Sequence, residues 1–136
     1  MKLMIDTNVL VDIFCKREPF FADSYGAIRK ALSEENVCLY SVSAATDLYY
    51  ILRKQMQSPS RAKDAISQAS QLVAFVEVLP ADIDTALLST TPDFEDAVVD
   101  AVAKRHEADY IVTRNTTDFV GSKVPALTPT EYLSKE

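Results

Sequence analysis

The stretch Lys2-Leu3-Met4-Ile5-Asp6-Thr7-Asn8-Val9-Leu10-Val11 decides the fold that we expect for this chain. Its apolar run before Asp6 contains no turn residue, which is typical of a short strand buried on both faces of a parallel sheet. Asp6 is therefore placed at the carboxyl end of that strand, the edge of an α/β sheet at which ligands bind. Thr7 and Asn8 then favour the start of a helix that continues to Phe14. An equally simple interpretation is that Asp6 only caps this helix.

The composition indicates an ordinary globular protein. The chain has 136 residues, of which 48% are hydrophobic and 25% charged, with only 2 Gly, so we expect one domain spanning residues 1–136. No apolar run approaches the roughly 20 residues that span a bilayer, and the chain begins with a strand pattern in place of a signal segment. We therefore expect a cytoplasmic protein without a membrane partner. Cys15 and Cys38 lack metal or redox spacing and are interpreted as buried apolar residues.

The net charge bears on nucleic-acid binding. A formal charge of -6 argues against a protein that coats nucleic acid by charge alone, because phosphate binding needs a basic surface. It does not exclude a nuclease. Carboxylates that hold divalent ions add to the negative count, and the bound ions reverse the local field.

Apolar periodicity predicts that helices and strands alternate along the rest of the chain. The predicted helices after the first are 20–35, 44–55 with Ser43 as N-cap, 59 to about 75, 82–89, 93–105 and a closing helix from Thr128. The predicted strands after the first are 37–40, 76–79, 109–113 and 124–127. This alternation predicts an α/β fold, a three-layer sandwich whose central, mainly parallel sheet of four or five strands is flanked by helices.

Four acids are expected to meet at one edge of this sheet. One buried strand ends at Asp6, and another ends at Thr113, just before the loop that contains Asp118. Both deliver polar residues to the same edge of the sheet, and the helices led by Asp47 and Asp96 also start from that edge. Clustered carboxylates repel one another and raise each other's pKa. Mg²⁺ or Mn²⁺ is the usual compensation, because both prefer hard oxygen ligands. Asp47 has a competing interpretation, a favourable interaction with its helix dipole.

The helix 93–105 carries further acids that we rank below Asp96. Asp100 lies one turn after Asp96 on the same face, and a like-charge pair at this spacing gives weak support for a site there. Lys104 is available to neutralise Asp100 in a purely structural role. Asp93 and Glu95 are assigned to solvent and to the helix dipole.

Four segments in this order and spacing resemble the PIN-domain ribonucleases, in particular the VapC-type toxins of toxin–antitoxin pairs. The segments are Met4–Leu10, Ser43–Tyr50, Asp93–Ala97 and Asp109–Phe119. The resemblance implies metal-dependent hydrolysis of RNA phosphodiester bonds with Mg²⁺ or Mn²⁺. The acids of the family correspond, in chain order, to Asp6, Asp47, Asp96 and the loop Asn115–Asp118.

Two departures from the family pattern affect the implied site. The second acid of the family is usually glutamate, and Asp47 is one methylene shorter. Where many members have aspartate after the threonine that ends the late strand, this chain has Asn115, a neutral ligand or supporting donor. Asp118 is then the better candidate for the fourth acid.

The resemblance also implies supporting residues and partners. Thr7, Asn8 and Thr113 would orient ligands or the attacking water, and Arg114 would contact a substrate phosphate unless it is simply solvated. Lys16, Arg17, Arg53 and Lys54 are further candidates for RNA contact or plain surface charges. A small antitoxin would cover a groove near the helices of residues 44–76, including Tyr49, Tyr50 and Ile51, and homodimers are common in the family.

Two other functions remain open on the sequence. The first is a degenerate, non-catalytic PIN-like domain that binds RNA or protein, suggested by Asp47 and Asn115. The second is a metal-dependent phosphatase of the haloacid-dehalogenase type, although that family needs a second aspartate where Asn8 stands. A hydrolase with a histidine base is disfavoured, because the single His106 lies late in a helix between charged residues.

Overall fold

The computed structural model describes residues 1–136 and has one sheet of five parallel strands. The strands follow the order β3-β2-β1-β4-β5, so β1 lies at the centre. The chain runs from β1 to β2 and β3 on one side and then returns to β4 on the other, so the strand order reverses at β1 and leaves its carboxyl end open between two neighbours. The bounds are β1 (Lys2–Ile5), β2 (Val37–Ser41), β3 (Ala74–Val76), β4 (Tyr110–Val112) and β5 (Ala126–Leu127).

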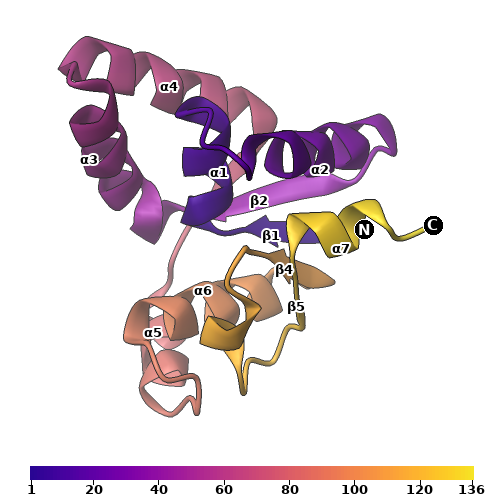
Figure 1. Cartoon of the computed structure of the whole chain (residues 1–136). Coiled ribbons are helices and arrows are strands. Elements are labelled where there is room, and N and C mark those ends of the chain that lie inside the picture. The colour runs from indigo at the N-terminus through magenta and orange to yellow at the C-terminus, as the bar shows by residue number, and fades with distance from the viewer.

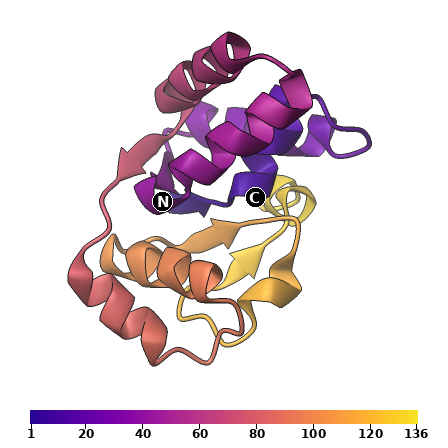
Figure 2. The same ribbon diagram turned by 90° about the vertical axis from the view of Figure 1, so that its left-hand side faces the viewer.

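Helices cover both faces of the sheet, which confirms the predicted three-layer sandwich (Figures 1 and 2). Four helices lie on one face: α1 (Thr7–Phe14), α2 (Phe21–Ser33), α3 (Ala45–Met56) and α4 (Pro59–Leu72). The other face carries α5 (Pro80–Leu87) and α6 (Phe94–Arg105), while α7 (Pro129–Leu133) packs on α2. None of these helices has the length and apolar composition that crossing a bilayer requires.

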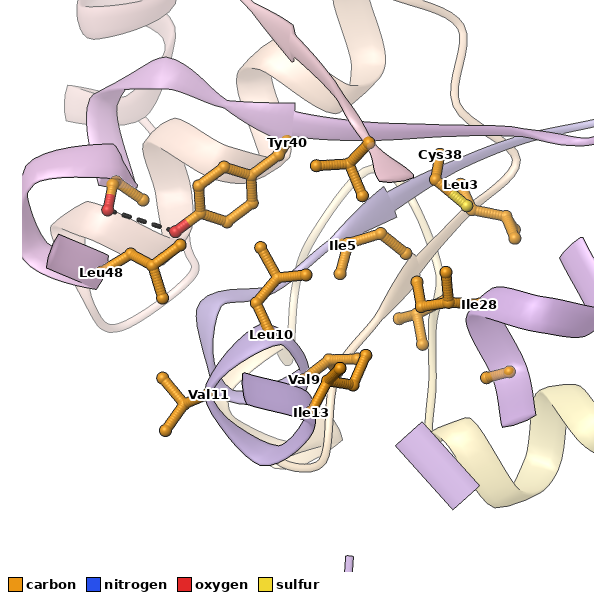
Figure 3. Packing of buried hydrophobic residues seen from close by; sticks show 14 of the residues in the cluster. Leu3, Ile5, Val9, Leu10, Val11, Ile13, Ile28, Cys38, Tyr40 and Leu48 are labelled. Carbon is orange, nitrogen blue, oxygen red and sulfur yellow. Dashed lines mark hydrogen bonds between the residues drawn. The ribbon is translucent and has the colours of Figure 1, made fainter. Parts of the chain in front are cut away.

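The central strand supplies side chains to two separate cores. Leu3 and Ile5 are buried in the larger cluster, with residues of α1, α2, α3 and α4 (Figure 3). Met4 points the other way and packs with Ile111 and the buried face of α6. This alternation is the two-residue period of a strand that is buried on both faces. The apolar run before Asp6 is thus explained by burial on both sides of the sheet.

Several element boundaries differ from the prediction. Strand β3 is Ala74–Val76 rather than 76–79, and Pro80 begins α5 instead of only ending the segment before it. Proline is accommodated at a first helical position because no hydrogen bond needs its nitrogen there. Ser43 does not cap α3, since a 3-10 turn at Val42–Ala44 intervenes and the hydroxyls of Ser43 and Ser41 lie 2.7 Å apart.

A buried tyrosine connects the starts of two helices. The hydroxyl of Tyr40 donates to the carbonyl of Ala44 at 3.2 Å, the contact drawn as a dashed line in Figure 3, and lies 2.7 Å from Oγ1 of Thr7. Burial raises the pKa of Tyr40, so the phenol keeps its proton and can donate. The bond fixes the turn before α3 relative to α1, and with it the position of Asp47 relative to Asp6.

Tyr40→Phe should lower the free energy of unfolding by about 1–3 kcal/mol, because the Thr7 hydroxyl and the buried Ala44 carbonyl each lose one hydrogen-bond partner. Urea denaturation monitored by circular dichroism measures this change. The matched control is Tyr49→Phe, at a half-buried tyrosine that packs edge-on against Tyr50. Equal stability of the two variants would contradict the role given to Tyr40.

Candidate functional site

The Asp6 carboxylate accepts three hydrogen bonds at the carboxyl edge of the sheet. The backbone N–H of Thr7 donates to Oδ1 at 2.8 Å, and the Thr113 hydroxyl donates to Oδ2 at 2.8 Å. The side-chain amide of Asn8 donates to the same Oδ2 at 3.3 Å. Ile5 and Val112 are paired residues of adjacent parallel strands, so the strand ends bring Asp6 and Thr113 together. The predicted meeting of these two residues is confirmed.

Asn8 and Thr113 also fix the loop that follows β4. The Thr113 hydroxyl accepts from the Asn8 side-chain amide and from the Asn115 backbone N–H, each at 3.1 Å. The Asn8 carbonyl oxygen accepts from the Arg114 backbone N–H at 3.1 Å. Both ends of the Asn8 side chain are therefore used. This neutral residue clamps the loop to α1 and adds no charge beside Asp6.

The carboxyl group of Asp96 lies in an unfavourable environment for its charge. Asp96 is in the first turn of α6, and its backbone N–H donates to the capping Asp93 at 3.0 Å. Burial, followed by repulsion from Asp6, Asp93, Asp118 and Glu95, raises the pKa of Asp96 to about 7. Asp96 is thus only partly ionised near neutral pH when no cation is present.

Asp6 and Asp118 belong to the same electrostatic group as Asp96. Burial raises the pKa of Asp6, an effect that the bonds from Thr113 and Thr7 oppose and that the charge of Asp118 reinforces. Asp118 is exposed in the 3-10 turn Thr116–Phe119. Three of the four expected acids therefore interact at one edge of the sheet.

The fourth expected acid, Asp47, reaches the group through a residue that we had assigned to solvent. Asp47 is exposed in the first turn of α3 and lines a cleft of about 610 Å³ with Asp6, Asn8, Arg17 and Glu95. Burial, then repulsion from Asp47, Asp93 and Asp6, raises the pKa of Glu95. Glu95 precedes Asp96 in the first turn of α6, and the charge of Asp6 acts on both carboxyl groups. In the sequence, the only indication of this role was that Glu95 is a third acid in the run Asp93–Asp96.

The acids fit a hard divalent cation that keeps part of its water shell. No three His, Cys, Asp or Glu side chains are arranged to hold one ion by themselves. The repulsion among Asp6, Asp96 and Asp118 is nevertheless of the kind that a cation relieves. The atoms that these residues offer to a metal ion are all carboxylate oxygens. Mg²⁺ and Mn²⁺ bind through one or two carboxylates and complete their shells with water and substrate oxygens.

Asp100, expected to support the site, has a different role in the structure. Its two oxygens accept from the backbone N–H groups of Lys123 and Val124, at 2.8 and 2.9 Å. The residue is buried and anchors the segment that leads into β5. Lys104 is not needed to neutralise it. We therefore exclude Asp100 from the candidate site.

A buried ion pair beside the site was missed from the sequence. The Nε of Arg114 donates to Asp12 at 2.6 Å, and its guanidinium lies 4.0 Å from the ring centroid of Phe20. Asp12 is fully buried in α1 and also accepts from the Ser24 hydroxyl at 3.1 Å. The signal was a lone acid in the otherwise apolar second half of the first helix, one turn after Asn8.

Comparison with known proteins identifies the class of this acid-edged parallel sheet. A family model described as PIN domain matches residues 2–117. Over 142 aligned residues, the chain is 28% identical to Ribonuclease VapC1 of Aquifex aeolicus (strain VF5), covering 98% of this chain and 94% of that protein. The chain belongs to the PIN-domain family.

Solved structures agree on the fold. VapBC2 from Rickettsia felis, bound to a DNA fragment from its promoter, superposes with a TM-score of 0.77 at 15% identity, covering 94% of this chain and 98% of that chain. A toxin–antitoxin complex from Klebsiella pneumoniae gives a TM-score of 0.66 at 22% identity, covering 93% and 97%. At these identities the likeness is one of fold.

Asp96→Asn should stabilise the metal-free protein at alkaline pH. The pKa of Asp96 is about 7 in the fold against an ordinary value of 3.8, so between these values the unfolded chain loses its proton first. Wild-type stability therefore falls as the pH rises through this window, and asparagine removes the effect. Differential scanning fluorimetry in EDTA should show a gain in Tm that grows to a few degrees between about pH 4 and about pH 8.

The control for this pH series is Asp64→Asn, which removes the same charge from an exposed position of α4. The gain for Asp96→Asn is compared with this variant at each pH, because the comparison shows what the loss of one exposed negative charge does by itself. A gain for Asp96→Asn that does not change with pH would contradict the environment described for this carboxyl group.

Proposed function

We propose that this protein is an endoribonuclease that hydrolyses RNA phosphodiester bonds with Mg²⁺ or Mn²⁺. The observation that carries the proposal is the mutually repelling group Asp6, Asp96 and Asp118 at the carboxyl edge of a PIN-domain sheet. The similarity to a protein named Ribonuclease VapC1 supports the same reaction class.

The chain's own residues have distinct parts in this proposal. When bound, the divalent ion would supply an activated water and neutralise charge on the phosphate. Asp6 and Asp96 would hold it, with Asp118 binding directly or through water. Asn8 and Thr113 keep the Asp6 carboxylate in one orientation through their hydrogen bonds. Ionisation of Asp96, whose pKa is about 7, would make ion binding stronger as the pH rises.

Asp47 and Glu95 would complete the acidic side of the cleft. Asp47 is exposed and shorter than glutamate, so its contact with an ion would run through water. Glu95 lines the same cleft and would help Asp47 to orient that water. Arg17 lines this cleft too, where its charge would attract the RNA backbone. Asn115 would act as a neutral neighbour of the site.

RNA cleavage should require Mn²⁺ or Mg²⁺ and should fall by at least about 100-fold in Asp6→Asn and Asp96→Asn, since loss of even an outer partner of a metal ligand costs 10–100-fold. Cleavage of total single-stranded RNA, resolved on denaturing gels, measures this loss. Asp64→Asn serves as the control. Equal cleavage by wild type and both site variants would reject the proposal.

A non-catalytic PIN domain is the second candidate. It is favoured by the exposed Asp47, by the neutral Asn115 and by the lack of three side chains arranged around one point. Isothermal titration calorimetry of the wild type with Mn²⁺ separates the two candidates. A catalyst should bind the ion at submillimolar concentration, and a degenerate site should not.

We also propose a small antitoxin as protein partner. Solved structures of similar fold include toxin–antitoxin complexes. A groove of about 520 Å³ lies between α4 and the helices α1 and α2, with Ile13, Phe14, Phe21 and Leu72 in its lining. Tyr50 and Ile51 on α3, 62% and 38% exposed, are apolar residues in the lining of the acidic cleft itself. An antitoxin helix would bury these side chains. We propose in addition that the chain forms a homodimer.

A small protein encoded next to this chain should co-purify with it, and Tyr25→Glu in the groove should reduce the recovery at least about tenfold, because a buried charge without a partner opposes binding. Leu88→Glu, at a residue 88% exposed after α5, is the control. Light scattering of the purified chain alone reports whether it dimerises. Recovery unaffected by Tyr25→Glu would contradict this groove as the binding surface.

A further inference from the structure

A second cleft adjoins the acidic site through a single loop. Thr113 contacts Asp6, and the next two residues, Arg114 and Asn115, line a separate cleft of about 360 Å³. Its other walls come from the segment before α2, including Phe20, and from the start of α7. None of the four candidate acids Asp6, Asp47, Asp96 and Asp118 lines this cleft. Thr113 bonds to Asp6 and the charge of Arg114 acts on the same carboxylate, so this cleft is placed to receive a nucleotide that neighbours the reacting phosphate.

Arg114 is held rigidly in the wall of this cleft. Its backbone N–H donates to Asn8 at 3.1 Å, and its Nε donates to the buried Asp12 at 2.6 Å. The guanidinium also lies on the ring of Phe20, at 4.0 Å from the centroid. The bond to Asn8 fixes the backbone, and the contacts with Asp12 and Phe20 fix the side chain, although 20% of it stays exposed. The entropy of ordering this long side chain is therefore lost on folding, not on binding.

The two terminal nitrogens of Arg114 have no partner in the protein. Only Nε among its side-chain nitrogens is hydrogen-bonded. The contrast is Arg105, which uses Nε, Nη1 and Nη2 to bind Asp82 and Glu77. Arg105 is a structural arginine whose donors are consumed inside the fold. Arg114 keeps a free pair of donors at the surface of a cleft.

We propose that Arg114 binds a backbone phosphate of the RNA next to the one that is hydrolysed, with Asp12 and Phe20 as positioning residues. This inference rests on the proposed ribonuclease function and adds a subsite to it. A planar guanidinium with two free nitrogens matches two phosphate oxygens in a bidentate contact. A fixed cation is also needed where a chain of net charge -6 must hold a polyanion beside its own carboxylates.

Asp23 limits where the phosphate lies. It lines the same cleft, and its carboxylate accepts a hydrogen bond from the Thr130 hydroxyl at the start of α7. The phosphate is therefore placed on the Arg114 and Asn115 side of the cleft. Asp23→Asn should strengthen RNA binding, because it removes a repelling charge.

The test measures how RNA affinity depends on salt. A fluorescein-labelled, mixed-sequence single-stranded RNA of about 12 nucleotides is titrated with protein that carries Asp96→Asn to prevent cleavage, and anisotropy gives the affinity. Each phosphate contact adds about 0.7 to the slope of log K against log salt for a single strand. Asp12→Asn with Arg114→Met should reduce the slope by about that amount, and Arg114→Lys should retain it.

The paired substitution keeps the protein folded, because removing Arg114 alone would leave Asp12 buried and unpaired. The matched control is Arg29→Met, which removes an arginine that lies 5.6 Å from the ring centroid of Tyr25 on α2. Its slope should equal that of the parent. On an oligomer with a neutral methylphosphonate backbone, the Arg114 effect should vanish, whereas a contact to a base would persist.

The outcomes separate this subsite from the nuclease proposal. An unchanged slope in the Arg114 variant, or no measurable RNA binding by the parent, overturns the subsite even if Asp6-dependent cleavage is observed. If the salt slope falls in the Arg114 variant but the wild type never cleaves RNA, the result supports the phosphate contact and rejects the catalytic proposal instead.

Discussion

The hydrogen bond from Thr113 to Asp6 is the contact on which the rest of this site depends. It joins residues that are 107 positions apart in the chain, at 2.8 Å, and it exists because β1 and β4 are parallel neighbours at the centre of the sheet. The same threonine accepts from Asn8 and from the following loop. One hydroxyl thus orients the first acid and places Arg114 and Asn115. Loss of the β1–β4 pairing would separate Asp6 and Asn8 from Thr113 and from the loop that follows it.

The acids at this edge contrast with the paired acids elsewhere in the molecule. Burial opposes ionisation of Asp82, yet the bonds from Arg105 and the Leu79 backbone leave its pKa below the ordinary value. Asp96 has acidic neighbours in place of such a partner, and its pKa rises to about 7. The fold therefore neutralises its structural carboxylates and leaves one group uncompensated. Uncompensated charge of this kind is a feature of functional sites, because a ligand can supply what the protein lacks.

The residues that could be recognised from the sequence are those whose role follows from strand ends. Asp6 and Thr113 each follow an apolar strand, and parallel pairing brings such positions together whatever the remaining packing. Asp12 was overlooked, Asp100 was expected in the wrong place, and Glu95 was left to solvent although it also lines the cleft. The roles of these residues depend on rotation about a helix axis and on what packs opposite. Glu95 and Asp100 lie on the same helix, yet one faces the cleft and the other binds the backbone of residues 123 and 124.

The sequence by itself determined the layer architecture, the parallel sheet and the edge at which the acids gather, because these follow from apolar periodicity and from chain connectivity, which are local properties. Only the tertiary structure decided which acids are free. A carboxylate becomes a binding group or an anchor according to the donors that packing brings within reach, as Asp12 and Arg114 illustrate. Such donors come from segments distant in the chain, and no pattern of neighbouring residues specifies their approach.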